Sequence, residues 1–135
     1  MIRIVDIDHV VLRVRDLERM IAFYGEVLGC AVEWRRDDLG LVHLRAGRAM
    51  IDLVPVDGKL GRQGGAPPGN EGRNVDHVCL RVAPFDAAAI AAHLAAHNVR
   101  VGEIRPRFGA EGEGVSIYLW DPEDNLVELK GAVQG

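Results

Sequence analysis

Cysteine is scarce in this chain. Among its 135 residues only Cys30 and Cys79 occur, and no Cys/His cluster has the spacing of a structural zinc site. A disulfide framework and a zinc finger are therefore excluded, and a reducing, cytoplasmic location is expected.

Basic runs and long apolar stretches are also missing. A net charge of -4 without any Lys/Arg-rich segment argues against a nucleic-acid partner or an anionic membrane surface. Arg3, Asp6 and Asp8 interrupt the apolar residues near the start, so neither a signal peptide nor a membrane span is expected. With 48% hydrophobic residues, the chain is typical of a single globular domain, residues 1–135, that binds a small molecule.

An internal repeat organises the sequence. Segment 8–14 reads DHVVLRV and segment 76–82 reads DHVCLRV, so the two differ at one position. Each copy alternates as a strand does, and each is followed by a helical pattern, first from Asp16 to Gly29 and then from Asp86 to about Asn98. Three short strands are expected after each helix, at about 31–36, 41–46 and 49–54, and at about 101–107, 115–120 and 126–130. The unit βαβββ therefore occurs twice, at about 5–55 and 75–131, in an α+β fold with a Gly- and Pro-rich loop at 56–74.

Strand alternation gathers potential metal ligands on one face. If Val10, Leu12 and Val14 lie under the helix, His9 points to the opposite, open side, and the repeat places His77 likewise. The same argument sends Asp52 and Glu128 to the open sides of their strands. Neighbouring strands add polar and aromatic groups to this surface, namely His43, Ser116, Tyr118 and Trp120.

A lone histidine on a strand is more often a hydrogen-bonded structural residue than a metal ligand. The repeat reverses that preference here. Two imidazoles converging with one or two carboxylates would leave polar groups partly desolvated, and a divalent ion resolves that cost. The predicted ligands are His9, His77, Glu128 and Asp52.

At these residues the sequence resembles the vicinal oxygen chelate superfamily, which includes glyoxalase I, extradiol dioxygenases, methylmalonyl-CoA epimerase and fosfomycin- or bleomycin-resistance proteins. The resemblance rests on the His9 strand and its helix, on segment 76–78, and on the closing segment 121–129. It implies two modules forming a curved mixed sheet around a metal-binding cavity, with His9, His77 and Glu128 as ligands. Asp52 matches the position of a fourth ligand in glyoxalase I-like members, generally Glu, and Asp is one methylene shorter.

The resemblance also implies a role for Arg13, which matches an arginine that glyoxalase I-like proteins use toward the glutathione carboxylate. The other interpretation is that Arg13 and Arg81 pair with nearby acids such as Asp8 or Glu128.

The favoured hypothesis is a lyase or isomerase of glyoxalase I-like type that depends on zinc, nickel, manganese or iron. The ion would polarise a carbonyl and stabilise an enediolate of a substrate with adjacent oxygens, while Glu128 or Asp52 moves the proton. Arg13, His43 and Tyr118 are the predicted substrate-binding residues, and glutathione is a possible cosubstrate.

Three alternatives stay open. An extradiol-type Fe(II) or Mn(II) dioxygenase would use His43 or Tyr118 as its acid–base group. A fosfomycin thiol transferase ranks below it, because the potassium and phosphonate loop is not evident. A non-catalytic drug-binding protein would line its cavity with aromatic side chains, and this chain has only seven aromatic residues. A homodimer is expected, in which the modules pair within one chain or between two.

Overall fold

The computed structural model describes residues 1–133. Their contacts divide into two compact units, Met1–Asn74 and a second that begins at Val75. Each unit contains one four-stranded mixed sheet, which is open rather than closed into a barrel, and the predicted βαβββ order is confirmed in both. No helix among these residues is long and apolar enough to cross a membrane.

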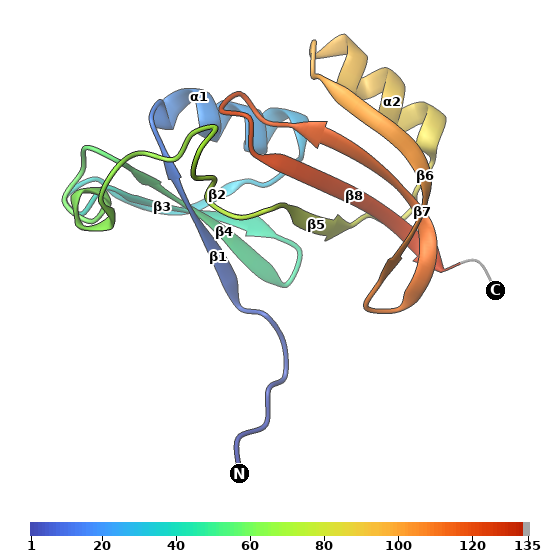
Figure 1. Ribbon diagram of the computed structural model, residues 1–135, viewed down its shortest axis with the longest axis horizontal. Coiled ribbons are helices and arrows are strands. Elements are labelled where there is room, and N and C mark those ends of the chain that lie inside the picture. Colours follow the sequence, from blue (N-terminus) through green and yellow to red (C-terminus); the bar gives the residue numbers. More distant parts are fainter. Residues whose placement is uncertain (134–135) are drawn as a thin grey trace. The chain divides into compact units, whose positions relative to one another are not determined.

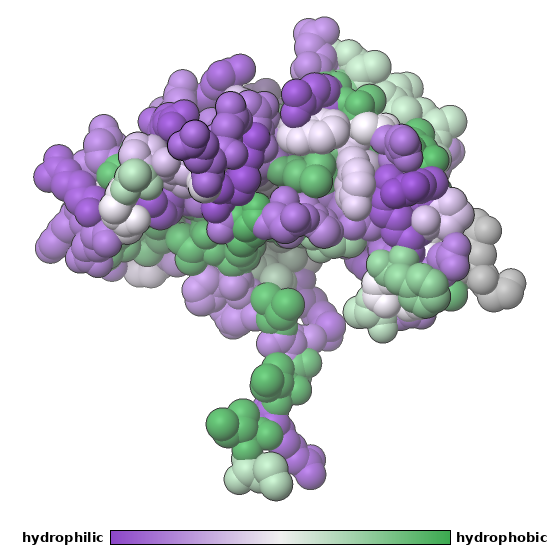
Figure 2. Space-filling view, in the orientation of Figure 1, coloured by the Kyte–Doolittle hydropathy of each residue, from purple (hydrophilic) through white to green (hydrophobic). Residues whose placement is uncertain are grey.

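The first unit carries a sheet in the order β1-β4-β3-β2. Strand β1 (His9–Val14) runs parallel to β4 (Ala49–Pro55), while β3 (Leu41–Ala46) pairs antiparallel with both β4 and β2 (Val32–Arg36). Figure 1 shows β1 in blue, with residues 1–8 extending beyond it. Those residues form no strand, and the apolar members among them remain more than 80% exposed, namely Met1, Ile2, Ile4, Val5 and Ile7 (Figure 2).

Helix α1 (Leu17–Ala22) begins where the sequence predicts. Asp16 is its N-cap, and the Asp16 side chain accepts a hydrogen bond from the backbone N–H of Arg19. The predicted helix does not stay α-helical to its end, because its last part widens into a π-helical segment, η1 (Phe23–Val27). Gly29 ends the turn with φ +74°, a conformation that favours glycine.

The second unit repeats the arrangement in the order β5-β8-β7-β6. Strand β5 (Val78–Arg81) runs parallel to β8 (Leu126–Val133), and β7 (Gly112–Trp120) pairs antiparallel with β8 and with β6 (Val101–Gly109). Helix α2 (Ala87–Ala96), drawn in yellow in Figure 1, is capped by Asp86 and contacts β6 and β7.

Alternation along the strands buries the expected apolar side chains. In the first unit Leu12 and Val14 of β1 and Ile51 and Leu53 of β4 are at most 2% exposed. In the second unit the corresponding positions of β7 and β8 are buried, namely Ile117, Leu119, Val127 and Leu129. Because side chains two apart share a face, the histidines and their neighbours are left on the other side of each sheet.

The predicted loop 56–74 belongs to the first unit and is partly ordered. It contains a short 3-10 helix, η2 (Gly61–Gly64), and a tight turn in which Gly69 and Gly72 form a β-bridge.

Candidate functional site

His9 lies at the start of β1, where the residue before it fixes its imidazole. The His9 Nδ1 atom is 2.7 Å from Asp8 Oδ1. A carboxylate can only accept, so the proton lies on Nδ1 and the lone pair of Nε2 remains available. This hydrogen bond raises the pKa of His9. Its side chain is about half exposed, which leaves Nε2 room for a ligand.

Asp52 and His43 form a second pair in the same unit. They face each other across β3 and β4, and His43 Nδ1 is 2.8 Å from Asp52 Oδ1. The sequence predicts that Asp52 points to the open face of its strand. Its side chain is only 5% exposed there, because it is paired with His43. The ring of Trp34 stacks on His43 with centroids 5.5 Å apart and an interplanar angle of 13°.

His77 in the second unit repeats the arrangement of His9. Its Nδ1 atom is 2.6 Å from Asp76 Oδ1, and its Nε2 atom is 3.2 Å from Glu128 Oε1. The duplicated Asp-His pair thus has the same local geometry in both copies. A carboxylate bonded to Nδ1 of a histidine is the arrangement that orients metal-binding imidazoles in proteins.

Glu128 has one oxygen left over. Its side chain is 6% exposed, and Oε2 is buried with no hydrogen-bond partner among residues 1–133. Cys79 is opposite Glu128 on β5, and burial, together with that carboxylate, raises the pKa of the thiol to about 11. A buried carboxylate oxygen without a donor is costly, and a cation is the partner that such an atom accommodates. The second unit therefore contains two side chains that fit metal ligands, His77 and Glu128.

The two histidine–carboxylate distances differ. Ligand atoms about 2.1 Å from one tetrahedral ion lie about 3.4 Å apart, and no two can exceed about 4.2 Å. The 3.2 Å between His77 Nε2 and Glu128 Oε1 matches the first value. The 4.0 Å between His9 Nε2 and Asp52 Oδ2 approaches the limit, and Asp52 is already bonded to His43. Glu128 therefore fits a ligand better than Asp52 does.

Tyr118 shares the open face of the second sheet with Glu128, which it pairs with across β7 and β8. Its ring meets His77 edge-on at 6.0 Å, and the guanidinium of Arg107 covers it at 3.8 Å. Arg107 also donates to the backbone oxygen and the hydroxyl of Ser116, which is fully buried. Ser116, predicted to line a ligand surface, thus serves to hold Arg107.

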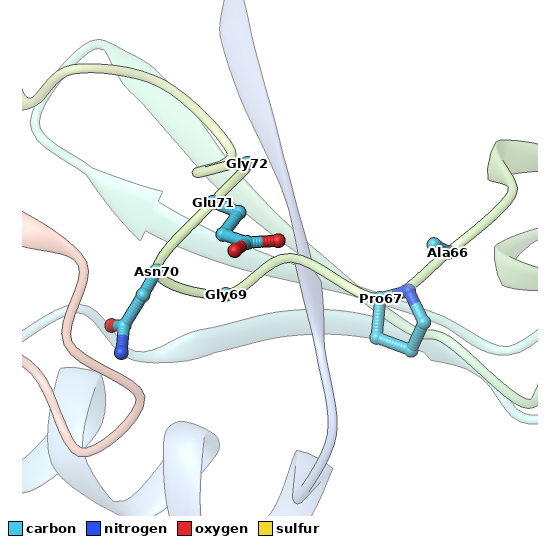
Figure 3. A pocket seen from close by; sticks show the side chains of 6 residues that line it. All are labelled: Ala66, Pro67, Gly69, Asn70, Glu71 and Gly72. Carbon is cyan, nitrogen blue, oxygen red and sulfur yellow. The ribbon is translucent and has the colours of Figure 1, made fainter.

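Arg13 holds the loop of its own unit. Its guanidinium donates to the carbonyl oxygens of Gly61, Gly65 and Ala66 at 2.8–3.0 Å. Asn74 bonds both the N–H and the C=O of Arg13, along the edge of β1. Residues of the same loop, from Ala66 to Gly72, line a pocket of about 570 Å³ whose polar side chains are Asn70 and Glu71 (Figure 3).

The interpretation that both arginines pair with nearby acids such as Asp8 or Glu128 is wrong for Arg13, whereas Arg81 does pair with an acid, although with Glu111. Arg13 bonds loop carbonyls, and Arg81 pairs with Glu111 at 2.6 Å. The two equivalent arginines thus have different partners, loop carbonyls for Arg13 and a carboxylate for Arg81. Arg13 as a substrate-binding residue stays a prediction, and its donors are engaged in this structure.

Within each unit the structure brings together one histidine and one carboxylate of the predicted set. His9 lies near Asp52, which is bonded to His43, and His77 lies beside Glu128 and Tyr118. Among residues 1–133, no three His, Cys, Asp or Glu side chains gather as a metal-binding group.

Residues 6–129 match the model of the glyoxalase/bleomycin resistance protein/dioxygenase superfamily. The chain belongs to this superfamily. Its matched region covers the repeat, both Asp-His pairs and the Glu128 strand, so the resemblance read from the sequence is confirmed.

Relatives within the superfamily differ in what their names describe. The virulence protein STM3117 of Salmonella typhimurium is 33% identical over 125 residues, which cover 91% of this chain and 81% of the relative. Its crystal structure aligns with a TM-score of 0.80 over 98% of this chain and 100% of that one, at 26% identity. The human mitochondrial methylmalonyl-CoA epimerase is 29% identical over 133 residues, covering 93% of this chain and 73% of the epimerase.

A metal-bound structure shares the fold. The fosfomycin resistance protein FosX of Listeria monocytogenes, solved with Mn(II) and sulfate, aligns with a TM-score of 0.70 over 97% of this chain and 93% of FosX. At 19% identity this likeness shows the fold alone. The relatives thus include an enzyme, the epimerase, and a metal-bound protein shares the fold.

Three residues have contacts that the sequence analysis does not predict, namely Asp8, Asp76 and Lys130. Asp8 and Asp76 orient the histidines, and their signal was the Asp that precedes both histidines in the repeat. The buried Lys130 lies two residues after Glu128 and donates to the carbonyl oxygen of Gly112. Its position gave no signal beyond the strand alternation that it shares with Glu128.

Proposed function

We propose that this protein is a divalent-metal-dependent lyase or isomerase of glyoxalase I-like type. One observation carries the proposal: Glu128 Oε2 is buried without a partner beside His77, whose Nδ1 is held by Asp76. The matching Asp8–His9 pair in the other unit supports it. Membership of a superfamily that contains enzymes is consistent with turnover.

His9, His77 and Glu128 would hold the ion, which would be zinc, nickel, manganese or iron. When bound, the ion supplies a Lewis acid that polarises a carbonyl and stabilises negative charge on adjacent substrate oxygens. Pairing of the two units within one chain and exchange between the chains of a homodimer would supply the same three ligands.

The chain's own residues then have separate tasks. Asp8 and Asp76 keep the imidazoles in the tautomer that presents Nε2. Tyr118, held under Arg107, lies where it can contact a small substrate beside Glu128. An acid–base group must also move a proton between neighbouring carbons, and the carboxylates available on the open faces are Glu128 and Asp52.

A metal-reconstituted activity panel tests this proposal. The purified protein is loaded separately with nickel, zinc, manganese and iron, and each form is assayed with the hemithioacetal of methylglyoxal and glutathione and with a catechol. We expect isomerisation of the hemithioacetal with at least one metal. Absence of turnover with all four would contradict the glyoxalase I-like assignment, and ring cleavage of the catechol would favour a dioxygenase instead.

A further inference from the structure

His43 is held in one orientation from two sides. Its Nδ1 atom is bonded to Asp52 Oδ1 at 2.8 Å, and one face of its ring is stacked on Trp34. The side chain is 20% exposed, compared with 5% for Asp52. A histidine fixed in this way has lost most of its rotational freedom, which is the preorganisation that catalytic acid–base groups have.

The Asp52 bond determines which ring nitrogen remains free. Because a carboxylate accepts, Nδ1 of a neutral His43 carries the proton and Nε2 presents a lone pair. Among residues 1–133 no hydrogen-bond partner is found for Nε2 of His43, and this atom is not among the buried unpartnered ones. It therefore faces accessible space.

The alternatives for proton transfer are less suited. Glu128 is 6% exposed and is the carboxylate that fits the metal. Asp52 is buried, and one of its oxygens is occupied by His43. The equivalent position to His43 in the second sheet, paired with Glu128, is Tyr118, a weaker base. His43 is the accessible basic group that a buried carboxylate orients.

We propose that His43 is the acid–base residue of the proposed isomerisation and that Asp52 is its positioning residue. Nε2 of His43 takes the proton from the substrate carbon next to the carbonyl, and the electrons of that C–H bond remain in the substrate as an enediolate. The resulting imidazolium is stabilised by the Asp52 carboxylate. The same proton returns to the neighbouring carbon, so the step is a net isomerisation and needs no external oxidant or reductant.

This inference rests on the proposed function, and its test separates the two. His43→Gln and Asp52→Asn are compared with wild type and with His93→Gln, which removes an exposed histidine from α2. Bound metal is measured on zinc-loaded protein, and so is the tautomer of His43, from the nitrogen chemical shifts of its imidazole. The kcat and KM for the hemithioacetal are measured with the metal that gives the wild type its highest turnover.

We expect His43→Gln to keep its zinc and lose about 100-fold or more in kcat with little change in KM. Asp52→Asn should also keep zinc, lower kcat, and reduce the Nδ1–H tautomer of His43 that predominates in wild type. His93→Gln should match wild type. A His43→Gln variant within about twofold of wild-type kcat, or a wild-type His43 protonated at Nε2, would overturn the inference. A wild type that is inactive with all four metals contradicts the proposed function instead.

Discussion

A single residue type, the aspartate before each histidine, determines how both imidazoles point. Asp8 and Asp76 are the first residues of the repeated segment, and each bonds Nδ1 of the next residue. The sequence identity of the repeat predicts equivalent strand positions for the two histidines. The structure extends this equivalence to the Asp–His pair, since each aspartate bonds Nδ1 and directs Nε2 away from itself.

The carboxylates do not repeat, and this difference separates the two halves of the candidate site. Glu128 reaches Nε2 of His77 at 3.2 Å, whereas Asp52 stays 4.0 Å from Nε2 of His9. Strand alternation predicted the face of both residues correctly. It could not predict the hydrogen bond between His43 and Asp52, because that contact depends on the register of β3 against β4.

Leu12 tests the face assignment at the level of one side chain. It alternates with His9 and Val11 on β1 and is 1% exposed, while Val11 is 44% exposed. Leu12→Ala should lower the free energy of unfolding by about 2–5 kcal/mol, because it leaves a cavity. Val11→Ala, the matched control, should cost about 1 kcal/mol or less. Urea unfolding followed by circular dichroism measures both, and equal losses would contradict the assigned faces.

At the scale of elements, the strands and helices were largely readable from the sequence. Both helical patterns begin where the sequence predicts, since Asp16 and Asp86 are the N-caps, and Asn98 at the end of α2 adopts a positive φ of 56°. These features depend on neighbours within a few residues. The π-helical end of α1 is not predicted, because five residues are too few for apolar spacing to distinguish an i→i+5 turn from an i→i+4 turn.

The loop between the repeats was less predictable. Its Gly and Pro content indicated a linker, yet its carbonyl oxygens are bonded by Arg13, 48 or more residues earlier. A Cβ at Gly64 would lie 2.5 Å from Arg13 Nε, so the glycine at this position leaves room for the Arg13 side chain. Composition gives no information on such distant partners.

Arg13→Ala should release this loop. Loss of three hydrogen bonds from the guanidinium is expected to raise amide hydrogen exchange in residues 61–74 by about tenfold or more. Arg81→Ala is the matched control, because Arg81 holds the same place in the repeat and pairs with Glu111 on the surface. Mass spectrometry of exchanged peptides gives the rates. Unchanged exchange in Arg13→Ala would show that the loop is held by other contacts.

At the scale of the whole molecule, the duplication gives the proposed metal site two of its ligands, one from each copy of the repeat. Each unit supplies one oriented imidazole, and the second adds a buried carboxylate with an unused oxygen. Neither unit contains three metal-binding side chains in a group among its described residues. If His9, His77 and Glu128 bind one ion, as we propose, each chain should bind a single ion.

Metal stoichiometry tests that statement most directly. Metal-free protein is titrated with Zn²⁺ by isothermal titration calorimetry, as wild type and as the variants His9→Gln, His77→Gln and His93→Gln. We predict one ion per chain in wild type and in His93→Gln, and an affinity lower by at least about 100-fold in each of the other two, although they lie in different units. Two ions per chain, or a loss confined to one of the two histidines, would contradict the proposed set of ligands, His9, His77 and Glu128.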